Sequence, residues 1–119
     1  MSTELQDITV DFEHQENVTI AKFVIQEISF LNNVDEVQCQ FREEIEAHRP
    51  NRLIIDFERV TYISTAGVRM LLSILMHVRR FGGKVLLCNV SEIIRAVLEL
   101  SHLTNIFKIF PDRQAAVAD

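Results

Sequence analysis

Short apolar runs alternate with amphipathic helical patterns along this chain, and that order restricts the possible folds more than any other feature. Near the N-terminus, Gln15-Glu16-Asn17 separates two runs rich in β-branched residues, which predicts a hairpin. The predicted strands cover 8–13, 18–25, 53–57, 85–88 and 106–110, a loop covers 30–33, and helices cover 34–49, 66–81, 91–100 and the tail after Pro111. Strands that alternate with helices favour an α/β fold with parallel strand pairs.

The length and the composition exclude several classes of protein. A chain of 119 residues fits one domain spanning 1–119, with enough buried surface to form a core without a disulfide or a metal ion. Only three glycines are present, so neither G-x-G-x-x-G nor a P-loop can be formed, and we expect no cofactor. With 12 Lys+Arg against 17 Asp+Glu, the net charge of −5 argues against direct binding to nucleic acid.

No segment predicts secretion or insertion into a membrane. The first residues are polar and acidic, unlike a signal peptide. The most apolar window, Ala66–Val78, is interrupted by Arg69 and Ser73 and is too short to span a bilayer. We therefore expect a cytoplasmic protein.

The cysteines and histidines do not predict a metal centre. Cys39 and Cys88 are far apart and form no C-x-x-C motif, so both are expected to be buried free thiols. The histidines show no i,i+4 pairing with one another and no nearby Cys or carboxylate at ligand spacing; they are His14, His48, His77 and His102. We therefore expect no zinc site.

The segment at 60–69, Val-Thr-Tyr-Ile-Ser-Thr-Ala-Gly-Val-Arg, joins a predicted buried strand to an amphipathic helix. Ser64 or Thr65 could accept a hydrogen bond from an early helix amide and act as the N-cap. The free amides and the positive end of the helix dipole also suit an anion, and Gly67 would leave room for its approach. A hydroxyl here could therefore cap the helix, bind a phosphate or carry one.

Nucleophilic catalysis at this junction is the weakest alternative. No histidine or acidic residue is nearby in the sequence, and Gly-x-Ser-x-Gly is absent. Asp56, on the predicted strand at 53–57, could approach the hydroxyls in space or could be a partly buried structural carboxylate. We expect no catalytic residue and no enzymatic activity, although a small hydrolase using Ser64 or Thr65 is an alternative.

Tyr62-Ile-Ser-Thr-Ala-Gly-Val-Arg-Met-Leu-Leu resembles the characteristic segment of STAS domains, specifically of the bacterial anti-sigma factor antagonists. The similarity continues, in the family's order and spacing, through 80–90, 94–103 and 106–110. It covers about residues 50–110, with looser agreement before them. The resemblance implies a STAS fold, in which a mixed β-sheet is packed with about four helices.

The resemblance also implies a mechanism. In this family, a Ser or Thr at the strand-to-helix junction is phosphorylated by a partner that is both a serine/threonine kinase and an anti-sigma factor. The unmodified antagonist binds this partner and releases the sigma factor, phosphorylation ends the binding, and a separate phosphatase restores it. Thr65, two residues before Gly67, occupies the position of the phosphoacceptor.

Two positions depart from the family's pattern. Ser64 stands where the common form of the motif has an aspartate, and Gln26–Ser29 falls where many relatives have Gly-Glu-Leu-Asp. Each change would remove an acidic group near the acceptor. Modification of Ser64 in place of Thr65, altered phosphorylation, and loss of phosphorylation are therefore all open.

The helix at 66–81 supplies a candidate partner-binding face. At about 100° per residue, the predicted core side consists of Val68, Leu71, Leu72, Leu75 and Val78. The opposite arc carries Arg69, Ser73, His77 and Arg80, flanked by Met70 and Met76, which could also lie at the edge of the core.

From the resemblance we expect Arg69, Met70 and Ser73 to bind the partner together with the junction residues Ser64, Thr65 and Gly67. His77 has no sequence partner that suggests catalysis and is expected at the surface. The alternative function keeps the fold but changes the class. It is a structural STAS subunit of a lipid or solute transport complex that is not phosphorylated.

Overall fold

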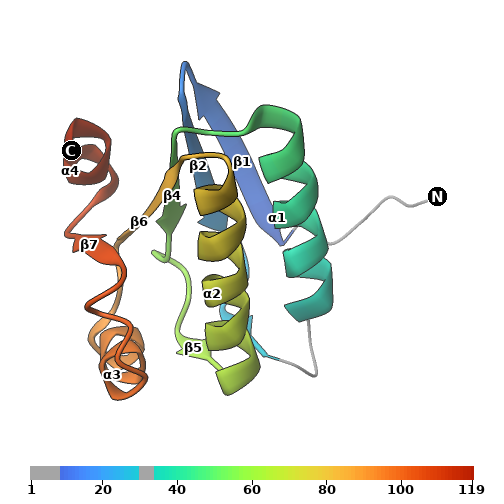
Figure 1. Ribbon diagram of the computed structural model, residues 1–119. Coiled ribbons are helices and arrows are strands. Elements are labelled where there is room, and N and C mark those ends of the chain that lie inside the picture. Colours follow the sequence, from blue (N-terminus) through green and yellow to red (C-terminus); the bar gives the residue numbers. More distant parts are fainter. Residues whose placement is uncertain (1–8, 30–33) are drawn as a thin grey trace.

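The computed structural model describes residues 9–29 and 34–119, so the loop predicted at 30–33 lies outside the described part of the chain. At its centre is a mixed five-stranded sheet in the order β1-β2-β4-β6-β7 (Figure 1). The α/β prediction is therefore confirmed.

The strands of this sheet lie at the predicted positions, with ends that differ by one or two residues; they are β1 (Val10–Gln15), β2 (Val18–Phe23), β4 (Arg52–Asp56), β6 (Lys84–Cys88) and β7 (Lys108–Phe110). β1 and β2 form the predicted antiparallel hairpin, and every other neighbouring pair in the sheet is parallel. The run at 53–57 was predicted as a central strand, and β4 is the middle strand of the sheet.

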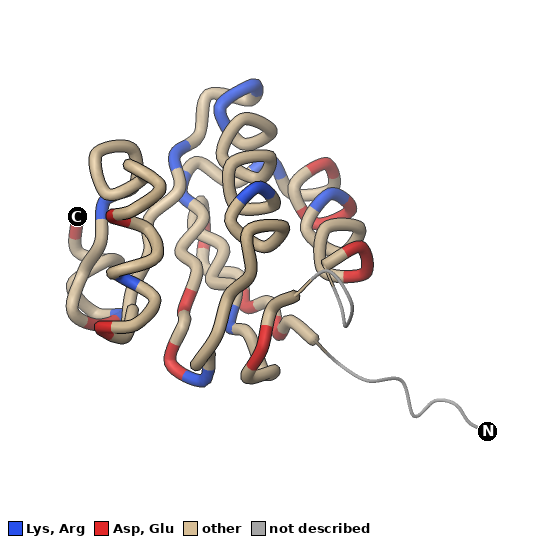
Figure 2. Tube along the Cα trace, turned by 90° about the horizontal axis from the view of Figure 1, so that it is seen from below, with Lys and Arg blue, Asp and Glu red and all other residues tan. Residues whose placement is uncertain are grey.

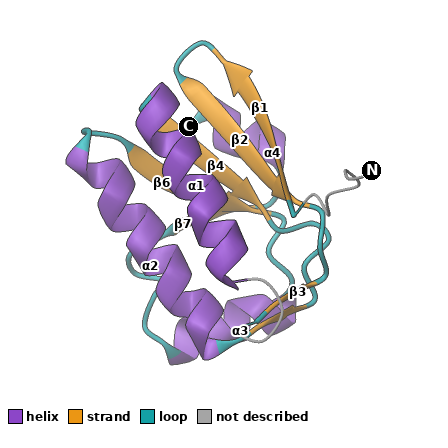
Figure 3. Cartoon of the chain, turned by 90° about the vertical axis from the view of Figure 1, so that its right-hand side faces the viewer, coloured by secondary structure: helices purple, strands orange, loops and turns teal. Residues whose placement is uncertain are grey.

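Helices cover both faces of the sheet. α1 (Val34–His48) and α2 (Thr65–Arg80) lie side by side on one face, and α4 (Arg113–Ala118) covers the other (Figures 1 and 3). Within β4, Ile55 faces the core under α1 and α2, whereas its neighbour Ile54 faces the smaller core under α4. Because both faces are covered, β4 and β6 read as continuous apolar runs and not as alternating patterns.

A second, very short sheet lies outside the main one. β3 (Glu27–Ile28) pairs in parallel with β5 (Tyr62–Ile63), and α3 (Glu92–Leu100) packs beside β5. The sequence did not predict these strands because two residues are too few to show a periodic pattern. β5 leads directly into the start of α2.

Gly82-Gly83 ends α2 as predicted. Gly82 adopts the left-handed conformation with φ of +82°, and its amide donates a hydrogen bond to the carbonyl oxygen of Arg79 at 3.0 Å. The amide of Gly83 donates to the carbonyl oxygen of Val78 at 3.1 Å. The basic side chains in the last turn of α2 lie at the negative end of its dipole.

The prediction for the cysteines is half correct. Both thiols are free, and Cys88 on β6 is buried, but Cys39 on α1 is exposed. α1 turns Val37, Phe41 and Ile45 toward the core, and position 39 falls on the opposite side of the helix. Burial, followed by the charge of Asp56, raises the pKa of the Cys88 thiol to about 12.

The sequence predicts no membrane-spanning helix. Among the described residues, 9–29 and 34–119, no helix combines the length and the apolar character needed to cross a bilayer.

Candidate functional site

The junction between β5 and α2 is built around Ser64. Its backbone is extended, with φ of −86° and ψ of 172°, and its side-chain oxygen accepts a hydrogen bond from the Gly67 amide at 3.2 Å. The Ser64 amide donates to the carbonyl oxygen of Ile28 in β3 at 2.9 Å, and the Ser64 carbonyl accepts from the Val68 amide at 2.9 Å. Ser64 is therefore the N-cap that ties α2 to the short sheet.

Thr65, the next residue, is in a different situation. It is the first residue of α2 and is exposed. Within the described part of the chain, its side-chain hydroxyl makes no hydrogen bond. The hydroxyl thus stands at the positive end of a helix of 16 residues, where a negative charge is favoured.

The charges of α2 itself favour an anion at this end. α2 has no acidic residue, and Arg69 lies exposed one turn after Thr65. The neighbouring helix α1 has the opposite character, with acidic residues at Asp35, Glu36, Glu43, Glu44 and Glu46 (Figure 2).

The segment Gln26–Ser29 lies beside the junction. The carbonyl oxygen of Gln26 accepts hydrogen bonds from the amides of Thr61 at 2.8 Å and Tyr62 at 3.2 Å. In the short sheet, Glu27 is the register partner of Tyr62, and Ile28 is that of Ile63. The two positions that depart from the family's pattern are therefore neighbours in space, although they are distant in the sequence.

Gly67 has a role other than the predicted one. We expected it to leave room for an approaching anion, but it is buried and faces the short sheet. A Cβ atom at this position would lie 2.7 Å from Cγ1 of Ile63 and 3.0 Å from Cγ2 of Ile28. The missing side chain therefore allows α2 to pack closely against β3 and β5.

Of the predicted partner-binding residues on α2, Arg69 and Ser73 are exposed, whereas Met70 is buried and was wrongly expected on this face. Met70 is only 1% exposed because the sheet, α1 and the short sheet together bury a wider arc of α2 than the predicted core side. Met76, by contrast, is 65% exposed. The exposed stripe of α2, called the Thr65 face below, consists of Thr65, Arg69, Ser73, Met76 and Arg80.

His77 was expected at the surface but is partly buried between the two long helices. Its side chain is 18% exposed, and its Nε2 atom lies 3.5 Å from a carboxylate oxygen of Glu46 on α1. A shallow groove between α1 and α2 begins here; its lining includes Gln38, Arg42, Ser73 and Met76. This groove continues the Thr65 face toward α1.

Asp56 is a structural carboxylate, one of the two alternatives left open by the sequence. It is 1% exposed, and its Oδ1 atom accepts hydrogen bonds from the Glu58 amide and the Asn89 side chain, both at 2.9 Å. Its Oδ2 atom pairs with Arg113 of α4 at 3.1 Å. Asp56 thus fixes the end of β4 to α4 and is fully engaged there.

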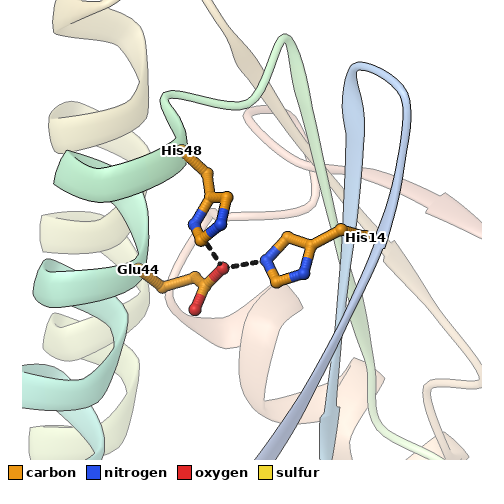
Figure 4. A group of neighbouring side chains, drawn as sticks. All are labelled: His14, Glu44 and His48. Carbon is orange, nitrogen blue, oxygen red and sulfur yellow. Dashed lines mark hydrogen bonds and ion pairs between the residues drawn. The ribbon is translucent and has the colours of Figure 1, made fainter.

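Three side chains outside the junction form a cluster that the sequence analysis missed. His14 of β1 and His48 of α1 both direct a ring nitrogen to the same carboxylate oxygen of Glu44 (Figure 4). The statement that no carboxylate lies at ligand spacing from a histidine is therefore wrong. Glu44 and His48 stand at i,i+4 on α1, and this spacing was the available signal.

The chain is similar to known proteins over most of its length. The family model described as "STAS domain" matches residues 9–116 of the chain. BtrV of Bordetella bronchiseptica, whose name assigns it to the anti-sigma factor antagonists, is 29% identical over 86 residues, which are 72% of this chain and 73% of BtrV.

Solved structures show the same fold at low sequence identity. An anti-sigma-factor antagonist (STAS) domain protein from Planctomyces limnophilus superposes with a TM-score of 0.82 and 21% identity over 92% of this chain and 94% of that one. The anti-sigma factor antagonist SpoIIAA in its unphosphorylated form gives 0.75 and 19% over 89% and 91%, and phosphorylated SpoIIAA of Bacillus gives 0.69 and 18% over 92% and 97%. A sulfate transporter family protein from Wolinella succinogenes gives 0.73 and 18% over 87% and 84%.

Proposed function

The chain belongs to the STAS domain family, and within this family we propose that it is an anti-sigma factor antagonist controlled by phosphorylation of Thr65. The unmodified chain binds an anti-sigma factor that is also a serine/threonine kinase, and this binding releases the sigma factor. Phosphorylation of Thr65 ends the interaction, and a phosphatase restores it. The chain itself is a substrate and a binding protein, and it catalyses no reaction.

The observation that carries the proposal is that the two hydroxyls of the junction differ in hydrogen bonding and exposure. The side chain of Ser64 is used as the cap of α2, whereas that of Thr65 is exposed and makes no hydrogen bond with the described residues. A kinase can reach Thr65 without disturbing the start of the helix. This favours Thr65 over Ser64 as the phosphoacceptor.

The fold can tolerate a phosphate at this position. A phosphothreonine adds about −1.5 to −2 charges and three acceptor oxygens at neutral pH. The amides and the dipole at the start of α2 favour such a group, and Arg69 lies one turn away on the same face.

The partner's surface need not tolerate the same group. A surface that fits a neutral hydroxyl must desolvate the dianion or place it against its own groups. A thousandfold loss of affinity requires only about 4 kcal/mol. The modification can therefore end binding while the fold stays intact.

The proposed partner-binding surface consists of the junction and the Thr65 face. Ser64 and Thr65 form its start, and Arg69 and Ser73 extend it along α2. Met76 takes the place that the sequence analysis gave to Met70, because only Met76 is exposed. Gly67 contributes indirectly, since it sets how closely α2 lies against the short sheet.

The relatives support this proposal. BtrV bears the name of an anti-sigma factor antagonist, and SpoIIAA, which shares the fold, has been solved in both unphosphorylated and phosphorylated forms. The fold is also shared with a sulfate transporter family protein. This likeness is the observation behind the alternative function, a structural subunit in a lipid or solute transport complex. In that case no kinase should act on Thr65.

The deciding experiment incubates the chain with ATP and the anti-sigma factor kinases of its own organism, and maps the modified residue by mass spectrometry. We expect one phosphate on Thr65, the same rate for Ser64→Ala if it remains folded, and no modification of Thr65→Ala. Equal modification of both variants would refute the site assignment. Absence of any modification, together with co-purification of transport proteins, would support the transport function.

A further inference from the structure

We propose that His14, Glu44 and His48 form a binding site for a divalent transition-metal ion of the zinc class. One ligand atom of each residue is available, and these three atoms all lie within 4.8 Å of one another (Figure 4). The site lies outside the Thr65 face and is independent of the proposed switch.

The fold brings the ligands together from two elements. His14 lies near the end of β1, the hairpin strand that forms one edge of the five-stranded sheet. Glu44 and His48 lie in the last two turns of α1. The i,i+4 spacing on α1 places Glu44 and His48 on one side of the helix, and that side faces the hairpin (Figure 4). The cluster therefore links α1 to β1.

The side chains already converge as ligands would. Nδ1 of His48 lies 2.9 Å from Oε2 of Glu44, and Nε2 of His14 contacts the same oxygen atom. The two imidazole rings stack with their centroids 4.0 Å apart. Two ring nitrogens thus meet at one carboxylate oxygen, so the three donor atoms lie within one small volume.

The donor set determines the class of ion. Two imidazoles and one carboxylate suit Zn²⁺, which binds these groups at about 2.0–2.2 Å, and they suit Ca²⁺ or Mg²⁺ poorly because those ions require oxygen ligands. In a tetrahedral complex, the ligand atoms stand about 3.3 Å apart. Small rotations of the side chains reach this spacing, since His14 and His48 are 41% and 47% exposed. A water molecule would complete the coordination.

A bound ion would fasten the edge hairpin to α1. Because the site requires the folded arrangement of β1 and α1, the ion would bind the folded state and raise its stability. The pair His77 and Glu46 provides a matched comparison, because it joins the same two residue types but has only one histidine.

The test is isothermal titration of the full-length chain, free of any histidine tag, with ZnCl₂. We expect one Zn²⁺ per chain and a rise in Tm on binding. His14→Ala, Glu44→Gln and His48→Ala should each weaken the affinity by more than about tenfold, the loss seen even when an outer partner of a metal ligand is removed. His77→Gln should bind as tightly as the unchanged chain.

A second readout uses Co²⁺ in place of Zn²⁺, since its visible absorption intensifies in a four-coordinate site. We expect this spectrum from the unchanged chain and from His77→Gln, and its loss in the three ligand variants. Circular dichroism will show that each variant is folded. The proposal is overturned if Zn²⁺ does not bind, or if binding survives the three ligand substitutions or depends on His77.

Discussion

The backbone amide of Gly67 donates a hydrogen bond to the side-chain oxygen of Ser64 at 3.2 Å, and this contact separates two adjacent hydroxyls with different roles. Ser64 caps α2, whereas Thr65 is exposed and its hydroxyl makes no hydrogen bond with the described residues. The residue that caps the helix therefore stands next to an exposed hydroxyl that has no part in the cap.

This division predicts different effects on stability. Ser64→Ala removes the cap and should lower the free energy of unfolding by about 1 kcal/mol. Thr65→Ala breaks no hydrogen bond and should change it by less than about 0.5 kcal/mol. Urea unfolding of both variants checks this, and a loss for Thr65→Ala as large as that for Ser64→Ala would contradict the assignment of the cap.

Gly67→Ala should destabilise the protein, although alanine favours helices by about 1 kcal/mol over glycine. The new Cβ atom would lie 2.7 Å from Ile63 and 3.2 Å from the carbonyl oxygen of Ile28. Such overpacking costs about 1–3 kcal/mol, so a net loss is expected. Ser73→Ala, on the exposed side of the same helix, serves as the control and should leave the unfolding midpoint nearly unchanged.

Arg113→Ala should cost about 2 kcal/mol of stability. The substitution leaves the Asp56 carboxylate buried without its ion-pair partner, and breaking a buried pair typically costs 3–5 kcal/mol. The smaller value is expected because the Arg113 side chain is 34% exposed and water can reach the gap. Glu13→Ala removes only the exposed partner of Arg113 and should have little effect, and equal losses for both variants would contradict this account.

The two thiols should differ in reactivity. Cys39 is exposed and Cys88 is buried, with a pKa raised from 9.0 to about 12 chiefly by burial. At pH 8 a thiol reagent should therefore modify one cysteine per chain rapidly, and Cys39→Ser should abolish this fast phase. Rapid modification of Cys88 in the folded protein would show that the core around β6 opens.

The same raised pKa makes stability depend on pH in the alkaline range. Above pH 9 the unfolded chain releases the Cys88 proton, whereas the folded chain retains it up to about pH 12. The folded state is therefore increasingly disfavoured as pH rises through this interval. Cys88→Ala should reduce the slope of stability against pH between these values.

The sequence predicted the main elements because their patterns are long. The stripe of Val34, Val37, Phe41 and Ile45 defines α1, and the hairpin and the end of α2 follow from local turn residues. β3 and β5 were missed because two residues show no period. The junction was found through Ser64 and Thr65, but the sequence could not say which hydroxyl the Gly67 amide would bind.

Other predictions from the sequence were wrong because tertiary packing decides which side chains are buried and which lie together. A helical wheel places Met70 at the edge of α2, yet the short sheet and its surroundings bury it. The cluster of His14, Glu44 and His48 combines a helical spacing with a strand residue 30 positions away from Glu44. Only the packing of β1 against α1 brings His14 to the other two.

The central claim is that a phosphate on Thr65 ends binding to the anti-sigma factor kinase. The most direct measurement is calorimetric titration of that partner with the unmodified chain and with the chain phosphorylated at Thr65 alone. The account predicts tight binding of the unmodified chain and an affinity about a thousandfold lower for the phosphorylated one, which corresponds to about 4 kcal/mol. Equal affinities for the two forms would contradict it.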